Sequence, residues 1–271
     1  MNDRVRITID NGVADVRLVR ADKLNALDQA MFEALVQAGA QLRADPSVRA
    51  VVLSGEGRAF CAGIDLGRIG AGGAEASGST PAPRRKLTPR THGITNTAQQ
   101  AAWTWRELPV PVIAAVHGVA FGGGFQVMLG ADMRYLAPDT RLSIMEIKWG
   151  LVPDMAGTVL MRHLARDDII RELTYTGRIF GAQQALDYGF ATRVCDEPHA
   201  AALATAREIA ARRPSAIVAA KRIFNPAASL DEAAAMLLES REQEQLMGAD
   251  NQLEAIRAEV AKRPAVFANA R

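Results

Sequence analysis

The segment His117–Gln126 has the clearest potential for chemistry in this sequence, because three consecutive glycines, Gly122 to Gly124, separate two apolar runs. The run at 112–116 is typical of a strand, and the run at 125–131 is compatible with a helix. Glycine loses the most backbone entropy on folding, so three in a row indicate a backbone that must stay bare. Bare backbone at a helix start offers N–H donors to a phosphate or a developing oxyanion. The glycines alone leave a ligand-free turn as the alternative.

The glycines do not match a nucleotide-binding motif. A dinucleotide fingerprint reads G-x-G-x-x-G, and Val127 occupies the position of its last glycine. A Walker loop would continue with Lys and Ser or Thr, which are missing here. A second set of donors could come from the turn Ala62–Ile64, and two N–H groups from separate loops can hold one thioester oxygen. We therefore favour an oxyanion hole, which polarises a carbonyl and stabilises an enolate, over a phosphate site.

The composition is that of a globular protein, with 49% hydrophobic and 23% charged residues in a chain of 271. The formal net charge of +2 is too small to indicate a nucleic acid or a membrane surface as partner. The two cysteines, Cys61 and Cys195, have neither metal-ligand spacing nor a disulfide framework. The N-terminal residues 1–9 lack a signal-peptide core, and no run of about 18 apolar residues predicts a membrane span. We therefore expect a cytoplasmic protein.

Strand and helix patterns alternate over the first two thirds of the chain. Alternating residues at 5–9 and 13–19 flank Asn11-Gly12, which predicts a hairpin. Asp28 is placed to cap a helix that ends before Asp45-Pro46. Further strands are predicted at 48–53, 112–116, 132–136 and 191–195, and further helices at 98–108, 125–131, 157–164, 169–176, 182–188, 200–213, 215–224, 229–247 and 250–262. This order predicts an α/β core at 1–198, which carries the active site, and a helical region at 199–271.

Residues 67–91 differ from the rest of the chain. They are rich in Gly, Ala, Ser and Pro, which predicts a surface loop. A basic cluster stands at its end, formed by Arg84, Arg85, Lys86 and Arg90. The cluster is either a solvated face or a contact for an anionic ligand, and the pattern does not decide between them.

Four segments resemble the enoyl-CoA hydratase/isomerase (crotonase) superfamily. Gly57–Leu66 and His117–Gly124 resemble the two segments that build the family's oxyanion hole. Asp22–Leu27 is similar to the family's early CoA-contacting segment, and the stretch Thr176–Ala191 is also similar to the family's sequences. The four matches occur in the family's order and span nearly the whole chain. The resemblance implies a spiral of ββα turns with a C-terminal helical trimerisation region, which assembles as a homotrimer or homohexamer.

The resemblance also implies the parts of the site. The oxyanion hole would be formed by the N–H groups of Ile64 and Gly123. The CoA moiety and the substrate would contact a set of residues from the first two segments, namely Lys23, Leu24, Ala26, Ala62, Gly63 and Asp65. An acyl-CoA substrate is the implied partner. No metal or redox cofactor is implied, because coenzyme A is part of the substrate.

Two acids distinguish between reactions within this family. Hydratases carry one glutamate two residues after the third glycine and a second in a later segment; here these positions hold Gln126 and Glu146. Glutamine cannot take up a proton at useful pH, which disfavours a mechanism with two carboxylates around one water. Asp154 follows Glu146 by eight residues, a spacing similar to that of the family's dienoyl-CoA isomerases. Those isomerases usually have an aspartate where Gln126 stands, so the match is incomplete.

The leading hypothesis is double-bond isomerisation of an enoyl- or dienoyl-CoA. Glu146 and Asp154 would share the roles of base and acid, with the direction of proton transfer left open, and Gln126 would position the thioester or a water. The alternatives are a 2-enoyl-CoA hydratase of fatty-acid oxidation and a non-catalytic acyl-CoA binding protein. Asp154 could instead cap the helix that begins near Ala156.

Two further residues near the glycines have a possible chemical role and a structural alternative. His117 could be a base, but a histidine at the end of a hairpin or in the core is the interpretation we favour. Cys61 could be a nucleophile, but no histidine is paired with it in the sequence, so we expect a small packed residue.

Overall fold

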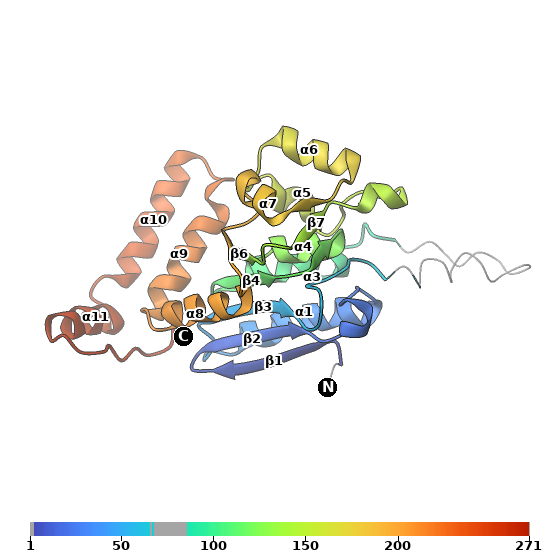
Figure 1. Ribbon diagram of the computed structural model, residues 1–271. Coiled ribbons are helices and arrows are strands. Elements are labelled where there is room, and N and C mark those ends of the chain that lie inside the picture. The colour runs from blue at the N-terminus through green and yellow to red at the C-terminus, as the bar shows by residue number, and fades with distance from the viewer. Residues whose placement is uncertain (1–2, 66, 68–85, 271) are drawn as a thin grey trace, which may run out of the picture.

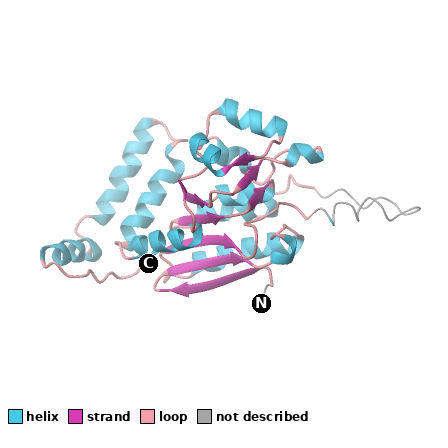
Figure 2. Ribbon diagram, viewed as in Figure 1, coloured by secondary structure: helices cyan, strands magenta, loops and turns pink. Residues whose placement is uncertain are grey.

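The computed structural model describes residues 3–65, 67 and 86–270 and has two sheets with helices around them (Figures 1 and 2). The larger sheet has the strand order β1-β2-β3-β4-β6-β9, and the smaller has the order β5-β7-β8. The strands are β1 (Val5–Asp10), β2 (Val13–Leu18), β3 (Ala50–Gly55), β4 (Val112–Val116), β5 (Val119–Phe121), β6 (Met133–Leu136), β7 (Arg141–Ser143), β8 (Phe180–Gly181) and β9 (Arg193–Val194). The α/β class expected from the sequence is confirmed.

The helices follow the strands in the first part of the chain and continue alone at the end. Those of the core are η1 (Ala21–Lys23), α1 (Gln29–Ala44), α3 (Thr97–Glu107), α4 (Gly123–Leu129), η2 (Glu146–Trp149), α5 (Gly157–Met161), α6 (Asp167–Thr176), α7 (Ala182–Tyr188) and α8 (Pro198–Ala210). The last three are α9 (Pro214–Ala227), α10 (Glu232–Leu246) and α11 (Asp250–Val260). Most of the predicted segments are present, with ends displaced by one to a few residues, as helix fraying leads one to expect.

Local signals in the sequence explain the first elements. Asn11 and Gly12 have φ of 48° and 80°, which suits the two-residue turn between β1 and β2. The Asp28 side chain accepts a hydrogen bond from the N–H of Met31 and so caps α1. Asn96 caps α3 in the same way, within a reciprocal capping box. The predicted hairpin and the predicted Asp28 cap are confirmed.

The larger sheet is covered on both faces, and the alternation along β3 shows how. Val51 and Leu53 belong to the main apolar cluster, to which α1, α3 and α4 also contribute. Ala50 and Val52 point to the other face, where they join a second cluster with alanines of α8, among them Ala202. Strands β2 to β9 of this sheet run parallel, so both faces have to be covered, and all five described side-chain positions of β4 are buried.

The chain alternates between the two sheets and thereby builds the spiral. After β4 it enters β5 of the smaller sheet, and after β6 it enters β7, which pairs with β5. This second sheet was not predicted, because strands of two or three residues are too short for a periodic pattern. Residues 141–147 divide into β7 and the start of η2. The smaller sheet places the glycine turn after β5 next to the segment after β7.

The boundary expected at residue 198 coincides with the start of α8, whose alanines pack on the larger sheet. Helices α9 to α11 extend from the core on one side of the molecule (Figure 1). They expose large apolar side chains, for example Phe224 at 75% and Met236 at 64%. Among the described residues, no helix is long and apolar enough to cross a membrane.

The predicted loop 67–91 lies mostly outside the described residues, which include only Gly67 and 86–91 of it. Within the described part, the Arg90 guanidinium donates a hydrogen bond of 2.8 Å to Gln99 of α3 and others to backbone carbonyls of its own segment. This basic residue is therefore engaged within the protein. Arg84 and Arg85 lie outside the described residues.

Candidate active site

The two glycine-containing turns lie side by side, joined by backbone hydrogen bonds. The Cys61 N–H donates to the Val119 carbonyl over 3.0 Å, and the Phe121 N–H donates to the Cys61 carbonyl over 3.1 Å. Cys61 and Ala120 form a parallel bridge. The turn that carries Ile64 is thereby held against β5, which leads directly into α4.

Two glycines permit this close approach. A Cβ on Gly63, whose φ is +88°, would lie 2.6 Å from the Phe121 carbonyl oxygen. A Cβ on Gly124 would lie 2.3 Å from the Cys61 carbonyl oxygen. Contacts this short do not occur for real side chains, so each turn can reach the other only because these positions lack one. The bare backbone expected from the sequence therefore serves the packing of the two turns as well as their exposed N–H groups.

The N–H groups of Ile64 and Gly123 donate no hydrogen bond to any described residue. Gly123 is the first residue of α4, where the N–H has no intrahelical partner. The neighbours of Ile64 are engaged: the Asp65 N–H donates to the Leu27 carbonyl and the Leu27 N–H to the Gly63 carbonyl. These bonds use the edge of segment 63–65 that faces Leu27, so the Ile64 N–H points away from Leu27. Two free donors on adjacent turns can together bind one oxyanion.

The second group of candidate residues surrounds Glu146, which begins η2. The residue is 9% exposed, and its carboxyl lies beside Gly122, where a Cβ would be 3.4 Å from Glu146 Oε1. The Gln126 side chain, from the second turn of α4, donates from Nε2 to this Oε1 over 2.5 Å. The other oxygen, Oε2, is buried and has no hydrogen-bond partner among the described residues. A buried unpaired acceptor costs about 1–3 kcal/mol, so this oxygen is the candidate atom for a contact with a ligand.

The orientation of Gln126 follows from its other contacts. Its Oε1 accepts the N–H of Met155 over 2.9 Å and the N–H of Gly157 over 3.0 Å. Because backbone N–H groups only donate, the oxygen of the amide has to face them and the nitrogen has to face Glu146. A proton taken up by Glu146 must then sit on Oε2. Gln126 is buried and holds Glu146 in place, rather than facing a substrate itself.

The electrostatic surroundings favour proton transfer by two carboxyls. Burial raises the pKa of Glu146 above its ordinary value, and the negative charge of Asp154 raises it further. The protein around Asp154 also raises the pKa of that carboxyl by removing part of its hydration, although the residue is open to solvent on one side. None of the described cations forms an ion pair with either carboxyl. Helix α5 is capped by Ala156 without a side-chain bond, so Asp154 does not serve as its cap.

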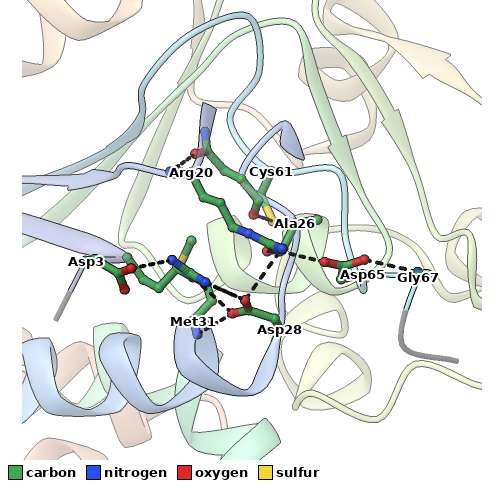
Figure 3. Close-up of polar contacts among 10 residues, drawn as sticks. Asp3, Arg20, Ala26, Asp28, Met31, Cys61, Asp65 and Gly67 are labelled. Atoms are coloured by element: carbon green, nitrogen blue, oxygen red, sulfur yellow. Dashed lines mark hydrogen bonds and ion pairs between the residues drawn. The ribbon is translucent and has the colours of Figure 1, made fainter. Parts of the chain in front are cut away.

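The predicted CoA-contacting residues come from two segments that the structure places together. The Ala62 N–H donates to the Leu24 carbonyl over 2.9 Å, so the segment after η1 runs beside the Ile64 turn. Lys23 is exposed and Ala26 is buried. The Asp65 carboxylate is already engaged, because it accepts from the Arg20 guanidinium at 2.7 Å and from the Gly67 N–H at 3.1 Å (Figure 3).

The remaining candidates have structural contacts. The His117 ring bonds the Gly57 carbonyl at 2.9 Å, near the end of β4. The Cys61 thiol is buried, lies 3.1 Å from the Asn25 carbonyl, and has its pKa raised to about 12 by burial, so it is a poor nucleophile. Sequence reasoning did not identify Met155 and Gly157 as supports of Gln126, since backbone donors leave no signal in side-chain identity. Within the described residues, no three His, Cys, Asp or Glu side chains gather as a metal site.

The Gln126 contacts lead to a stability prediction. Replacing Gln126 by Leu, which has a similar size, removes the acceptor of two buried N–H groups. Each unsatisfied donor costs about 1–3 kcal/mol, so we expect the free energy of unfolding to fall by at least about 2 kcal/mol in urea titrations. Gln126→Glu keeps an acceptor for both N–H groups but replaces the donor to Glu146 Oε1 by an oxygen, so any loss of stability in that variant reports the contact with Glu146 instead. Equal stability of Gln126→Leu and wild type would contradict the assigned role.

Comparison with known proteins agrees with this geometry. The model of the enoyl-CoA hydratase/isomerase family matches residues 8–270. A mitochondrial Δ(3,5)-Δ(2,4)-dienoyl-CoA isomerase from Mus musculus is 33% identical over 227 residues, which are 81% of this chain and 68% of that protein. Carnitinyl-CoA dehydratase from Salmonella typhi is 32% identical over 230 residues, which are 83% of this chain and 81% of that protein.

Solved structures show the same fold. An enoyl-CoA hydratase from Bacillus anthracis superposes with a TM-score of 0.87 at 26% identity, over 99% of this chain and all of the other. One from Mycobacterium smegmatis has a TM-score of 0.83 at 28% identity, over 97% and 98% of the two chains. The spiral expected from the sequence is therefore confirmed. Together with the match over residues 8–270, this shows that the protein belongs to the enoyl-CoA hydratase/isomerase family.

Proposed function

We propose that the protein isomerises a double bond in an acyl-CoA, with a 3,5-dienoyl-CoA as the substrate that fits the site best. The observation that carries this proposal is the free Oε2 of Glu146, a buried carboxylate oxygen beside the glycine turn. A second carboxyl of raised pKa, Asp154, lies close enough to influence Glu146 electrostatically. Two carboxyls and two free N–H groups are the parts that a proton shift next to a thioester requires.

The proposed reaction moves one proton off the acyl chain and adds one further along it. The Ile64 and Gly123 N–H groups bind the thioester oxygen. Glu146, beside the glycine turn, removes a proton from C2 onto its Oε2, and the electrons enter the conjugated system as a trienolate. Asp154 then gives a proton to C6, which moves the double bonds from positions 3 and 5 to positions 2 and 4. The composition of the substrate does not change, and the two carboxyls exchange their protonation states.

The contacts of Gln126 support isomerisation over hydration. Addition of water needs two acceptors that hold and activate one water molecule. The only oxygen of the Gln126 side chain already accepts two backbone N–H groups, and its nitrogen faces Glu146. Gln126 thus has no acceptor to offer a water. The name of the Salmonella relative, a dehydratase, keeps hydration as the second candidate.

The protein has a cavity next to Asp154 that would accommodate the acyl chain of the proposed substrate. A cavity of about 150 Å³ lies between α3 and α5, lined by Asp154 and by apolar side chains that include Ile94, Trp103 and Val159. An acyl group that passes Glu146 and then Asp154 would end there. Trp103 also donates its indole N–H to Glu107 over 3.0 Å, which fixes the ring. The arrangement suits an apolar chain that is long enough to present C6 to Asp154.

The raised pKa values predict a bell-shaped dependence of kcat/KM on pH. The base has to be ionised, so the rate falls on the acid side as that carboxyl is protonated. Because burial raises its pKa, this fall lies above the pH of about 4.5 expected for an ordinary glutamate. The acid has to be protonated, so the rate falls again on the alkaline side, at a pH above that of an ordinary aspartate because burial also raises the pKa of Asp154. A rate that stays constant from pH 4 to pH 9 would contradict this paired mechanism.

A pair of assays tests the function. The protein is incubated with a 3,5-dienoyl-CoA, and the absorbance of the 2,4-dienoyl product is followed. We expect its appearance. The same protein is incubated with crotonyl-CoA, where a loss of conjugated absorbance would report hydration. Turnover of crotonyl-CoA without any 2,4-dienoyl signal would replace isomerisation with hydration.

The proposal extends to assembly and location. We propose a homotrimer or a pair of trimers, supported by the apolar residues that α9 to α11 expose, such as Phe224 and Val260 at 75% and 80%. We further propose that the enzyme acts in the cytoplasm, on the acyl-CoA alone, without a metal or redox cofactor.

A further inference from the structure

Arg20 joins the two segments that surround the Ile64 turn. Its Nη1 lies 3.0 Å from the Ala26 carbonyl oxygen and 2.7 Å from Oδ2 of Asp65, and 3.6 Å from Oδ2 of Asp28 (Figure 3). The Arg20 side chain is 14% exposed. Nη1 of Arg20 therefore contacts both the Ala26 carbonyl, which precedes α1, and the Asp65 carboxylate, which directly follows Ile64.

The segments that Arg20 joins also form a short ladder of backbone bonds. Ala62 N–H donates to Leu24, Leu27 N–H to Gly63 and Asp65 N–H to Leu27, over 2.9, 2.7 and 3.1 Å. The direction of the Ile64 N–H follows from this ladder, since its neighbours bond to one side. Arg20 closes the ladder at the Asp65 end. Asp65 has no other described cation as a partner.

The ion pair between Arg20 and Asp65 is charged and held in place by its neighbours. The Arg20 guanidinium lowers the pKa of Asp65, so the carboxylate stays ionised over the working pH range. Arg4 holds Asp28 through Nη2 at 2.9 Å and Nε at 3.2 Å, so two arginines face two buried or half-buried aspartates. The positive charges of the two arginines and the negative charges of the two aspartates cancel, so this group of four side chains offers little net charge to CoA.

We propose that Arg20 is a positioning residue of the oxyanion hole, which clamps Asp65 to the Ala26 carbonyl and thereby directs the Ile64 N–H at the thioester oxygen. The proposal rests on the proposed function, because it assigns Ile64 to that hole. It also gives Asp65 a different role from the CoA contact expected from the sequence. Arg20 touches no reacting atom and acts only through the backbone of the Ile64 turn.

A thioester whose colour reports carbonyl polarisation tests the clamp without turnover. The absorbance of 4-(dimethylamino)cinnamoyl-CoA moves to longer wavelength when hydrogen bonds polarise its carbonyl. We expect a shift on binding to wild type and a clearly smaller shift with Arg20→Gln at saturation. Removal of one oxyanion donor costs about 10²- to 10³-fold in kcat, so a misdirected donor should cost about 10- to 100-fold. KM should change little, because the CoA contacts remain.

Three further variants distinguish the effect of losing the Arg20–Asp65 contact from the effect of a general loss of folding. Arg17→Gln is the matched control, since Arg17 forms an ion pair of 2.8 Å with Asp15 on β2, away from the site; it should keep both the shift and kcat. Arg20→Lys retains the charge and should recover part of both. Asp65→Asn keeps an acceptor for the Gly67 N–H but loses the ion pair, and it tests the clamp even if Arg20→Gln does not fold.

The outcomes distinguish this proposal from the proposed function. Smaller shifts and lower kcat in Arg20→Gln and Asp65→Asn, with no further loss in the double variant, support the clamp. A wild-type shift and wild-type kcat in a folded Arg20→Gln or Asp65→Asn variant overturn it and leave the proposed function intact. An increase in KM alone for Asp65→Asn overturns it in favour of a CoA contact. No shift with the wild-type protein overturns the oxyanion hole itself.

Discussion

Glu146→Gln should lower kcat for dienoyl-CoA isomerisation by about 10²- to 10⁴-fold, the usual contribution of a general acid or base. The change is nearly isosteric, so the carbonyl of the new side chain can still accept the Gln126 N–H that now reaches Oε1. What disappears is the free oxygen Oε2, which alone can take up the proton. Steady-state kinetics with a 3,5-dienoyl-CoA measure the effect. Unchanged kinetics would leave only a binding function or a different base.

The same variant should be more stable than wild type at neutral pH. A carboxyl with a raised pKa binds its proton more tightly in the folded state than in the unfolded state, so its ionised form costs stability. This cost is absent at a pH below the unfolded-state pKa, and it develops as the pH rises. Glu146→Gln removes the charge, and the gain over wild type should grow from pH 4 to pH 7 in urea titrations. Higher stability with lost activity is the pattern of a functional residue.

Glu242 provides the matched control for this substitution. It is 8% exposed, close to the value for Glu146, but it forms an ion pair of 2.7 Å with Arg222 between α9 and α10. Glu242→Gln should leave kcat unchanged and should not raise stability. Equal effects of the two substitutions on kcat would show that the loss in Glu146→Gln arises from general disturbance of the fold.

Gly124→Ala is expected to produce the second large effect. The new Cβ would lie 2.3 Å from the Cys61 carbonyl oxygen and 2.8 Å from the Cys61 Sγ, so the two turns have to move apart. Overpacking of this kind costs about 1–3 kcal/mol of stability. Because both oxyanion donors lie on these turns, we expect kcat to fall by about 100-fold or more, as when a donor is lost. Chemical denaturation and steady-state kinetics measure the two effects.

Gly181→Ala is the matched control for Gly124→Ala. A Cβ on Gly181 has no atom within 4 Å, and its φ of −92° is open to any residue. This variant should keep wild-type stability and kcat. If Gly124→Ala also keeps wild-type kcat, the close approach of the two turns is not required for the reaction.

The sequence was sufficient to predict features that depend on neighbouring residues. The Asn11-Gly12 turn and the Asp28 cap follow from backbone and side-chain preferences that act over two or three residues. The ordered motifs predicted the family and its fold, because a bare backbone at two turns can be read directly from glycines. The residues of the oxyanion hole, the two acids and the CoA contacts remain predictions until variants are assayed.

The sequence could not predict contacts between residues that lie far apart along the chain. Gln126 was expected to face substrate or water, yet its amide is used by Met155, Gly157 and Glu146, which lie 20 to 31 residues further along. Strand β5 has only three residues and was missed, because its partner β7 supplies the hydrogen bonds that define it. Asp65 was expected to contact CoA, and only the structure shows that Arg20 occupies its carboxylate.

The sequence by itself determined that two bare turns and two acids exist in this chain, since each is a property of residue type and local order. The tertiary structure decided which of their atoms remain free. Burial beside Gly122, together with the amide of Gln126, leaves one oxygen of Glu146 without a partner. The physical reason is that the satisfaction of a polar atom depends on everything that packs around it, and only the folded chain brings those groups together.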